Sequence, residues 1–114
     1  MKFQIERELF LGPLSVVTSV VERRQTMPIL ANVLLVAKDG VLSVTATDLE
    51  VELVAVADVK IDVTGEVTVP GRKLLDICRA LPSDADVSIS QSGEKLNIKS
   101  GRSKFSLTTL PAAE

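Results

Sequence analysis

The chain has 114 residues, 46% of them hydrophobic, and a formal net charge of −2. This length is typical of one domain with a buried core, and the charge excludes a protein that binds nucleic acid through an overall basic surface. Without His and with a single Cys, the chain lacks the commonest general base, an internal disulfide and a zinc site built from Cys and His. The sequence resembles no signal peptide, contains no apolar run that could cross a membrane, and suits a reducing cytosol, so we expect a cytoplasmic protein.

The first half of the chain is predicted to begin with a strand and a helix. Residues 2–6 alternate polar and apolar side chains, as a half-buried strand does. Residues 8–22 follow with the spacing of one apolar helical stripe, formed by Phe10, Leu14, Val17 and Val21. Pro13 lies inside this stretch, so the helix either begins near Gly12 or is kinked there.

Three strands complete this first unit, at residues 29–37, 41–47 and 51–57. The first is almost continuously apolar, and the second alternates apolar with polar side chains. Lys38, Asp39 and Gly40 form a hairpin signal between these two strands.

The second half repeats the same order of elements. A short strand at residues 66–69 ends at Pro70 and Gly71, which open a helix over residues 72–81. The buried stripe of this helix is expected to consist of Leu74, Leu75, Cys78 and Leu81. Strands at residues 87–91, 95–100 and 103–109 complete the second unit.

This repetition predicts an α+β fold in a single domain over residues 1–110. The domain would consist of two pseudo-symmetric β-α-β-β-β units, at about residues 1–58 and 59–110, with two helices on one face and antiparallel sheets outside. Residues 111–114 would begin a linker to a further domain. Two equivalent helices on one face suit a protein that presents them to a single partner, whereas the chemistry of an ordinary enzyme does not require them.

Three groups of residues need an interpretation from their local pattern. Cys78 lies on the apolar stripe of the second helix and is predicted to be a buried hydrophobic residue, not a nucleophile. Asp48 and Glu50 could ligate a hard cation, but carboxylates at a turn are more often solvated, so no metal is expected. The last hairpin is basic, which on an exposed edge strand protects against aggregation; its cations are Lys95, Lys99, Arg102 and Lys104.

Four blocks of sequence closely resemble one family, the bacterial DNA sliding clamp, which is the beta subunit of DNA polymerase III. They are residues 26–32, 47–50, 69–79 and 100–107, and the similarity to the family's first domain continues in register over essentially the whole chain. The resemblance implies the DNA-clamp fold. It also implies a non-catalytic subunit that pairs head to tail into a homodimer ring of six similar domains, with helices on the inner wall and sheets outside.

The resemblance further implies a function in DNA replication and a set of partners. The ring would encircle double-stranded DNA without reading its sequence and would tether the replicative polymerase as a processivity factor. Polymerase and clamp loader would bind the full-length protein, in a pocket between domains that this chain does not include. The chain alone is expected to be a monomer, and no cofactor is expected.

The same resemblance assigns two sets of site residues. Arg24 falls in a DNA-contacting loop after the first helix, and Arg72 and Arg79 would face the hole from the second helix. Gln25 stands where some relatives have proline. Arg24 also has a simpler role, because a cation at the end of a helix complements the helix dipole. The subunit interface would include Lys73, Ile77, Arg102, Lys104, Phe105 and Leu107.

Two other functions remain as alternatives at this point. The chain could be a protein-interaction adaptor on a repeated α+β scaffold, which would not depend on the topology of DNA. It could also be a small metal-dependent enzyme that uses Asp48 and Glu50, which divalent cations would stabilise. For Ile77 and Phe105, the alternative to an interface is a place in the core.

Overall fold

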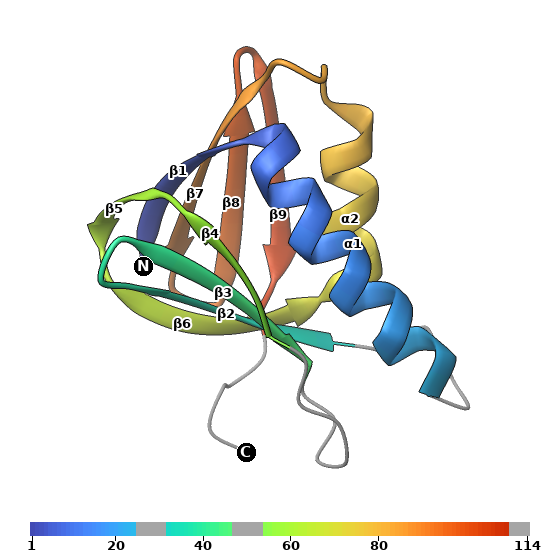
Figure 1. The fold of residues 1–114 in the computed structure, drawn as a ribbon. Coiled ribbons are helices and arrows are strands. Elements are labelled where there is room, and N and C mark those ends of the chain that lie inside the picture. Colours follow the sequence, from blue (N-terminus) through green and yellow to red (C-terminus); the bar gives the residue numbers. More distant parts are fainter. Residues whose placement is uncertain (25–31, 47–53, 110–114) are drawn as a thin grey trace.

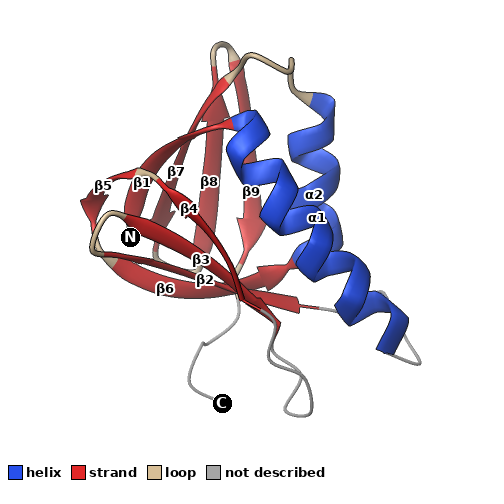
Figure 2. Cartoon of the chain, in the orientation of Figure 1, coloured by secondary structure: helices blue, strands red, loops and turns tan. Residues whose placement is uncertain are grey.

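The computed structural model describes residues 1–24, 32–46 and 54–109, and within them the chain forms two helices and nine strands (Figure 1). The first part comprises β1 (Lys2–Glu6), α1 (Arg7–Arg24), β2 (Asn32–Lys38), β3 (Val41–Ala46) and β4 (Val54–Asp58). The second part comprises β5 (Lys60–Val63), β6 (Gly65–Pro70), α2 (Gly71–Ala80), β7 (Asp86–Ser92), β8 (Lys95–Ser100) and β9 (Ser103–Thr108). The helices lie side by side on one side of the strands (Figure 2).

The strands form two antiparallel sheets. The strand that precedes each helix belongs to the sheet whose other strands follow the other helix. The five-stranded sheet has the order β5-β1-β7-β8-β9, and the four-stranded sheet has the order β4-β3-β2-β6. Strand β1 therefore pairs with the three-strand meander that follows α2, and β6 pairs with the meander that follows α1. This exchange binds the two pseudo-symmetric units into one α+β domain, which confirms the predicted fold class.

The strand β5 is a feature that the sequence analysis did not predict. It spans Lys60–Val63, pairs with β1, and is separated from β6 only by Thr64. One segment therefore continues from the five-stranded sheet into the four-stranded sheet. Four residues with a single partly buried apolar side chain packed on the core, Ile61, carry too weak an alternation to be recognised as a strand.

Helix α1 begins at Arg7 and runs through Pro13 to Arg24, which excludes a start near Gly12, one of the two alternatives that the sequence left open. The preceding residue explains why the helix tolerates proline there. A proline ring clashes with the Cβ of the residue before it when that residue is helical, and Gly12 has no Cβ. The helix also extends two residues beyond the predicted end, which makes Arg24 its last residue and not part of a following loop.

The core lies between the helices and the inner faces of both sheets, and it is mainly aliphatic. Three residues of the predicted α1 stripe and the complete predicted stripe of α2 are buried: Phe10, Leu14, Val17, Leu74, Leu75, Cys78 and Leu81. Phe3 on β1 and Phe10 on α1 meet edge to face, with ring centroids 6.3 Å apart. These contacts fix the two helices against the sheets.

The hairpin predicted at Asp39 and Gly40 is confirmed by its backbone geometry. Both residues have positive φ, 54° and 76°, as a tight two-residue hairpin turn requires. Several predictions fall on parts of the chain that the structure does not describe. They concern the start of the strand predicted at 29–37, the side chain of Val21, Asp48, Glu50 and the linker at 111–114. Among the described residues, no helix is both long and apolar enough to span a membrane.

Candidate nucleic-acid and subunit interfaces

Helix α2 exposes a row of charged side chains opposite its buried stripe. Arg72, Lys73, Asp76 and Arg79 are all exposed, whereas Leu74 and its neighbours on the stripe are buried. Asp76 Oδ1 lies 3.6 Å from Arg72 Nε, in an ion pair between two side chains that are each more than half exposed. Solvent screens such an exposed pair, so it contributes little to stability.

The first turn of α2 carries two cations and no acid. Arg72 and Lys73 follow directly after Gly71, the first helical residue. The positive end of the helix dipole disfavours cations at this position, and no side chain caps the helix at Pro70. The dipole of α2 therefore does not favour Arg72 and Lys73, although for Arg72 the exposed pair with Asp76 offsets part of this cost. Arg79 differs, because a cation in the last turn is favourable by itself.

The C-terminal end of α2 is held by Arg7, a residue that the sequence analysis did not single out. Arg7 Nε donates to the carbonyl oxygen of Cys78 at 3.0 Å, and Arg7 Nη2 donates to that of Arg79 at 3.2 Å. Arg7 also pairs with Glu8, and its side chain is only 14% exposed. Because Arg7 satisfies these carbonyl groups, the Arg79 side chain is not required for that purpose.

The two helices run antiparallel, which decides where the predicted DNA-contacting residues lie. The start of α1 meets the end of α2 through Arg7, and Thr18 of α1 lies against Gly71 at the start of α2. Arg24, six residues after Thr18, therefore lies at the same end of the helix pair as Arg72. Arg79 lies at the other end, about 10 Å further along α2. The structure describes the backbone of Arg24 but not its side chain.

The predicted interface residues lie where α2 meets β9, the edge strand of the five-stranded sheet. Ile77 and Phe105 are half-buried and pack on the margin of the core. Leu107 lies on the same face of β9 as Phe105 but is only 8% exposed and belongs to the core cluster. Ile77 and Phe105 thus lie on two elements that meet at this margin, and both are partly open to solvent.

The charged residues predicted around Ile77 and Phe105 are spread over three elements. Lys73 is exposed on α2, Arg102 lies in the β8–β9 turn, and Lys104 is exposed on β9. Alternation along β9 places Lys104 on the opposite face of the sheet from Phe105. Among the described strands, β9 pairs only with β8, so its outer edge is available for another strand.

Cys78 is buried, as predicted, and its thiol is unreactive. Burial raises the pKa of the Cys78 thiol from 9.0 to about 12, and the charge of Arg7 opposes this only in part. The thiol is therefore protonated at neutral pH and is not a nucleophile. Among the described residues, no three acidic or Cys side chains are placed to hold a metal ion. Asp48 and Glu50 fall outside that part of the chain.

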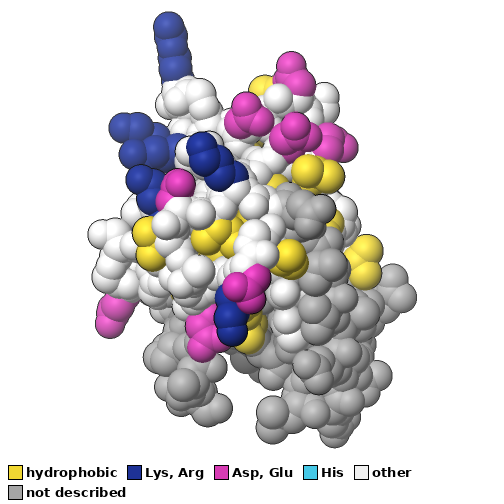
Figure 3. All heavy atoms as spheres, turned by 60° about the vertical axis from the view of Figure 1, so that its left-hand side comes forward, with side chains coloured by type: hydrophobic (Ala, Val, Ile, Leu, Met, Phe, Trp, Pro, Cys, Tyr) yellow, Lys and Arg dark blue, Asp and Glu magenta, His cyan; other side chains and the backbone are white. Residues whose placement is uncertain are grey.

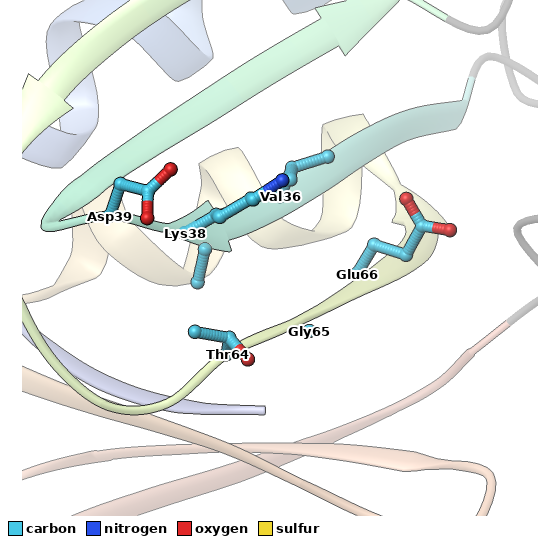
Figure 4. A pocket seen from close by; sticks show the side chains of 7 residues that line it. Val36, Lys38, Asp39, Thr64, Gly65 and Glu66 are labelled. Atoms are coloured by element: carbon cyan, nitrogen blue, oxygen red, sulfur yellow. The ribbon is translucent and has the colours of Figure 1, made fainter.

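Two hollows of the described surface are lined mainly by charged and small residues. One, of about 350 Å³, lies where the β2–β3 turn approaches the junction of β5 and β6 (Figure 4). Its charged lining residues are Lys38, Asp39 and Glu66, with Thr64 beside them. A second hollow, of about 480 Å³, lies beside Arg102 and is lined by Asp84 and Asp86 among others.

The fold and these surfaces define a class of protein: a repeated α+β domain that presents a pair of helices with a cationic second helix on one side and an open strand edge at its margin. The sequence model described as "DNA polymerase III beta subunit, N-terminal domain" matches residues 1–114. The chain belongs to this family.

Similar proteins and structures agree with this assignment. The beta sliding clamp of Pseudomonas putida is 55% identical over 113 residues, covering 98% of this chain and 31% of that protein. That of Escherichia coli K12 is 52% identical over 115 residues, covering 100% and 31%. The crystal structure of the DNA polymerase III subunit beta from Pseudomonas aeruginosa has a TM-score of 0.90 at 51% identity, covering 100% and 31%. The chain thus spans about a third of the length of each of these three proteins.

Proposed function

We propose that this chain is the first domain of a three-domain subunit that pairs head to tail with a second copy to form a ring around double-stranded DNA. The family assignment and the match to 31% of the length of its relatives support this reading. The single structural observation that carries it is the pair of helices on one face, with cations in the first turn of α2 that the helix itself disfavours.

In this proposal the helices form part of the inner wall of the ring. Arg72 and Arg79 face the DNA from α2, and Arg24 contacts it from the end of α1. A few arginine contacts to phosphates give a weak, salt-dependent attraction that is independent of sequence, and tight binding would prevent sliding. The net charge of −2 is consistent with attraction that depends on few residues.

The proposed subunit interface is the strip formed by α2 and β9. Ile77 and Phe105 supply its apolar centre, with Leu107 beside them, and Lys73, Arg102 and Lys104 supply charges around it. The open edge of β9 suits the addition of a strand from the neighbouring subunit. The isolated chain lacks the partner surface of the third domain, so we propose that it is a monomer.

The whole protein would act without catalysing a reaction and without a cofactor. It would hold the replicative polymerase on the template, and polymerase and clamp loader would bind parts of the protein outside this chain. Such a protein acts in the cytoplasm, at the nucleoid.

The test uses the full-length protein loaded by its loader onto nicked circular DNA. Retention on circles followed by release after linearisation is the expected result, because a ring is held by topology and slides off free ends. Equal release from circular and linear DNA would show ordinary surface binding. That result would favour an adaptor over a clamp.

A further inference from the structure

The lysines of this chain gather on a face of which the proposed function uses only Lys104, at the edge strand β9. Five of the seven lysines lie on the outer face of the five-stranded sheet, away from the helices: Lys2, Lys60, Lys95, Lys99 and Lys104. We call this surface the lysine face. The arginines, by contrast, lie on the helices and in the β8–β9 turn.

Strand register fixes this placement. Ser88 of β7 pairs with Lys99 of β8, and Lys99 pairs in turn with Lys104 of β9, so these three residues form one row across the sheet. Lys60 pairs with Gln4 of β1, which itself pairs with Ser88 and so extends the row. All five members are exposed. Between the lysines the face carries Ser, Gln and Asn side chains.

Edge protection explains only part of the lysine face. Lys104 and Lys60 are on edge strands, where a charge discourages aggregation. Lys2 and Lys99 are on central strands, which need no such protection. Moreover, Lys99 lies directly opposite Lys104, and like charges opposite one another destabilise a sheet. An anionic partner would relieve this repulsion.

The charges of the sheet are separated by sign. Glu6 of β1 and Asp86 of β7 lie directly opposite one another at one end of the same face, and both are exposed. Figure 3 shows basic side chains gathered in the upper left of the view, with an acidic side chain among them, and acidic side chains gathered in the upper right. A nucleic acid, which is uniformly negative, would be repelled at the acidic end. The chain also has no Trp or Tyr on which exposed bases could stack.

We propose that the lysine face docks an acidic segment of another protein. Lys95 and Lys99, four residues apart on β8, are separated by about 13 Å along the strand, as are carboxylates four residues apart in an extended segment. Glu6 and Asp86, at one end of this face, then orient the bound segment, because they repel its negatively charged residues. Binding through lysines is weak and reversible, because the ammonium group is strongly hydrated and makes no bidentate contact.

The test uses this chain, isotope-labelled, and a serine-rich peptide with glutamates spaced like Lys95 and Lys99. At low salt we expect amide shifts confined to the lysine face, and we expect them to disappear as salt is raised. The double variant Lys95→Gln/Lys99→Gln should weaken binding about fivefold. The matched control is Lys38→Gln/Lys73→Gln, which removes the same charge from the two lysines outside the face and should change binding less than about twofold.

Four results would overturn the proposal. They are no binding at low salt, shifts centred elsewhere, equal weakening by the control variant, and an oligothymidine ligand that binds the lysine face as tightly as the peptide. The last result would identify the surface as a nucleic-acid site. None of these results bears on the topological test above, because the lysine face lies on the side of the sheet opposite the helices.

Discussion

Arg7 shows how one side chain can tie the two pseudo-symmetric units together. It begins α1, yet its guanidinium group donates to the last carbonyl groups of α2, more than 70 residues later in the chain. A cation at this position also complements the dipole of α2. The sequence did not predict this contact, because Arg7 is only one of several charged residues at the junction of a strand and a helix.

We expect Arg7→Met to destabilise the domain by about 2 kcal/mol, since the charged hydrogen bonds are lost while the apolar stem is kept. Urea unfolding followed by circular dichroism measures this. Arg79→Met is the matched control, because it removes an exposed arginine from the same end of α2 and should change stability little. Equal losses in the two variants would contradict the role of Arg7.

Cys78 predicts a pH dependence of stability. Its pKa is about 12 in the folded chain and near 9.0 when unfolded, so between these values the unfolded state releases a proton that the folded state keeps. This contribution to stability is complete below about pH 9 and is lost as the pH rises towards 12. Above pH 9 the free energy of unfolding of the wild type should therefore fall more steeply than that of Cys78→Ala, by up to about 1.4 kcal/mol per pH unit.

The comparison isolates the thiol because the two proteins differ only at Cys78, and the chain has no Tyr. Parallel curves for the two proteins would show that the thiol ionises equally in both states. Cys78 would then be more accessible than its burial indicates.

At the scale of elements, the sequence predicted both helices and eight of the nine strands, because long apolar periodicities and Gly or Pro turns mark them. It could not predict β5, whose pairing with β1 depends on residues far away in the chain. The sequence also could not predict that β1 and β6 each pair with the strands of the other unit, because pairing between distant strands leaves no local signal. The same holds for the packing of α1 on the start of α2.

That packing depends on Gly71. A Cβ at this position would lie 2.9 Å from Thr18 Oγ1 and 3.0 Å from Val33 Cγ1, closer than side chains normally approach. Thr18 is fully buried, so little space surrounds it into which it could move away from an added methyl group. Gly71→Ala should therefore destabilise the domain by about 1–3 kcal/mol.

Thermal unfolding of a double-mutant cycle tests this contact. Thr18→Ala removes one of the two obstructing groups, so the double variant Thr18→Ala/Gly71→Ala should lose less stability than the sum of the single variants. Strict additivity would mean that the two helices do not approach each other at this point.

At the scale of the whole molecule, the proposed clamp function predicts a salt dependence for DNA binding. Arg72→Ala in the full-length protein should weaken binding and reduce the slope of log affinity against log salt by about one unit, as expected for one lost phosphate contact. Arg24→Ala should do the same. Filter binding over a series of salt concentrations measures the slope. A slope that stays unchanged in either variant would remove that arginine from the DNA-facing wall.

The open margin formed by α2 and β9 supplies the second whole-molecule prediction. Phe105 is half-buried at this margin although its neighbour Leu107 on the same face is in the core, so a partner surface would complete its burial. Phe105→Arg in the full-length protein should therefore separate the ring into monomers, because a charge in the apolar centre of an interface has no partner. Analytical ultracentrifugation measures the change.

The control for Phe105→Arg is Ser106→Arg, the next residue of the same strand, whose exposed side chain lies on the opposite face of the sheet. It adds the same charge to β9 and should leave the ring intact. The unfolding curve of the isolated chain separates the remaining explanations. If Phe105→Arg leaves this domain folded, the loss of the ring is due to the interface. If the domain itself unfolds, Phe105 belongs to the core, and the interface must lie elsewhere on the chain.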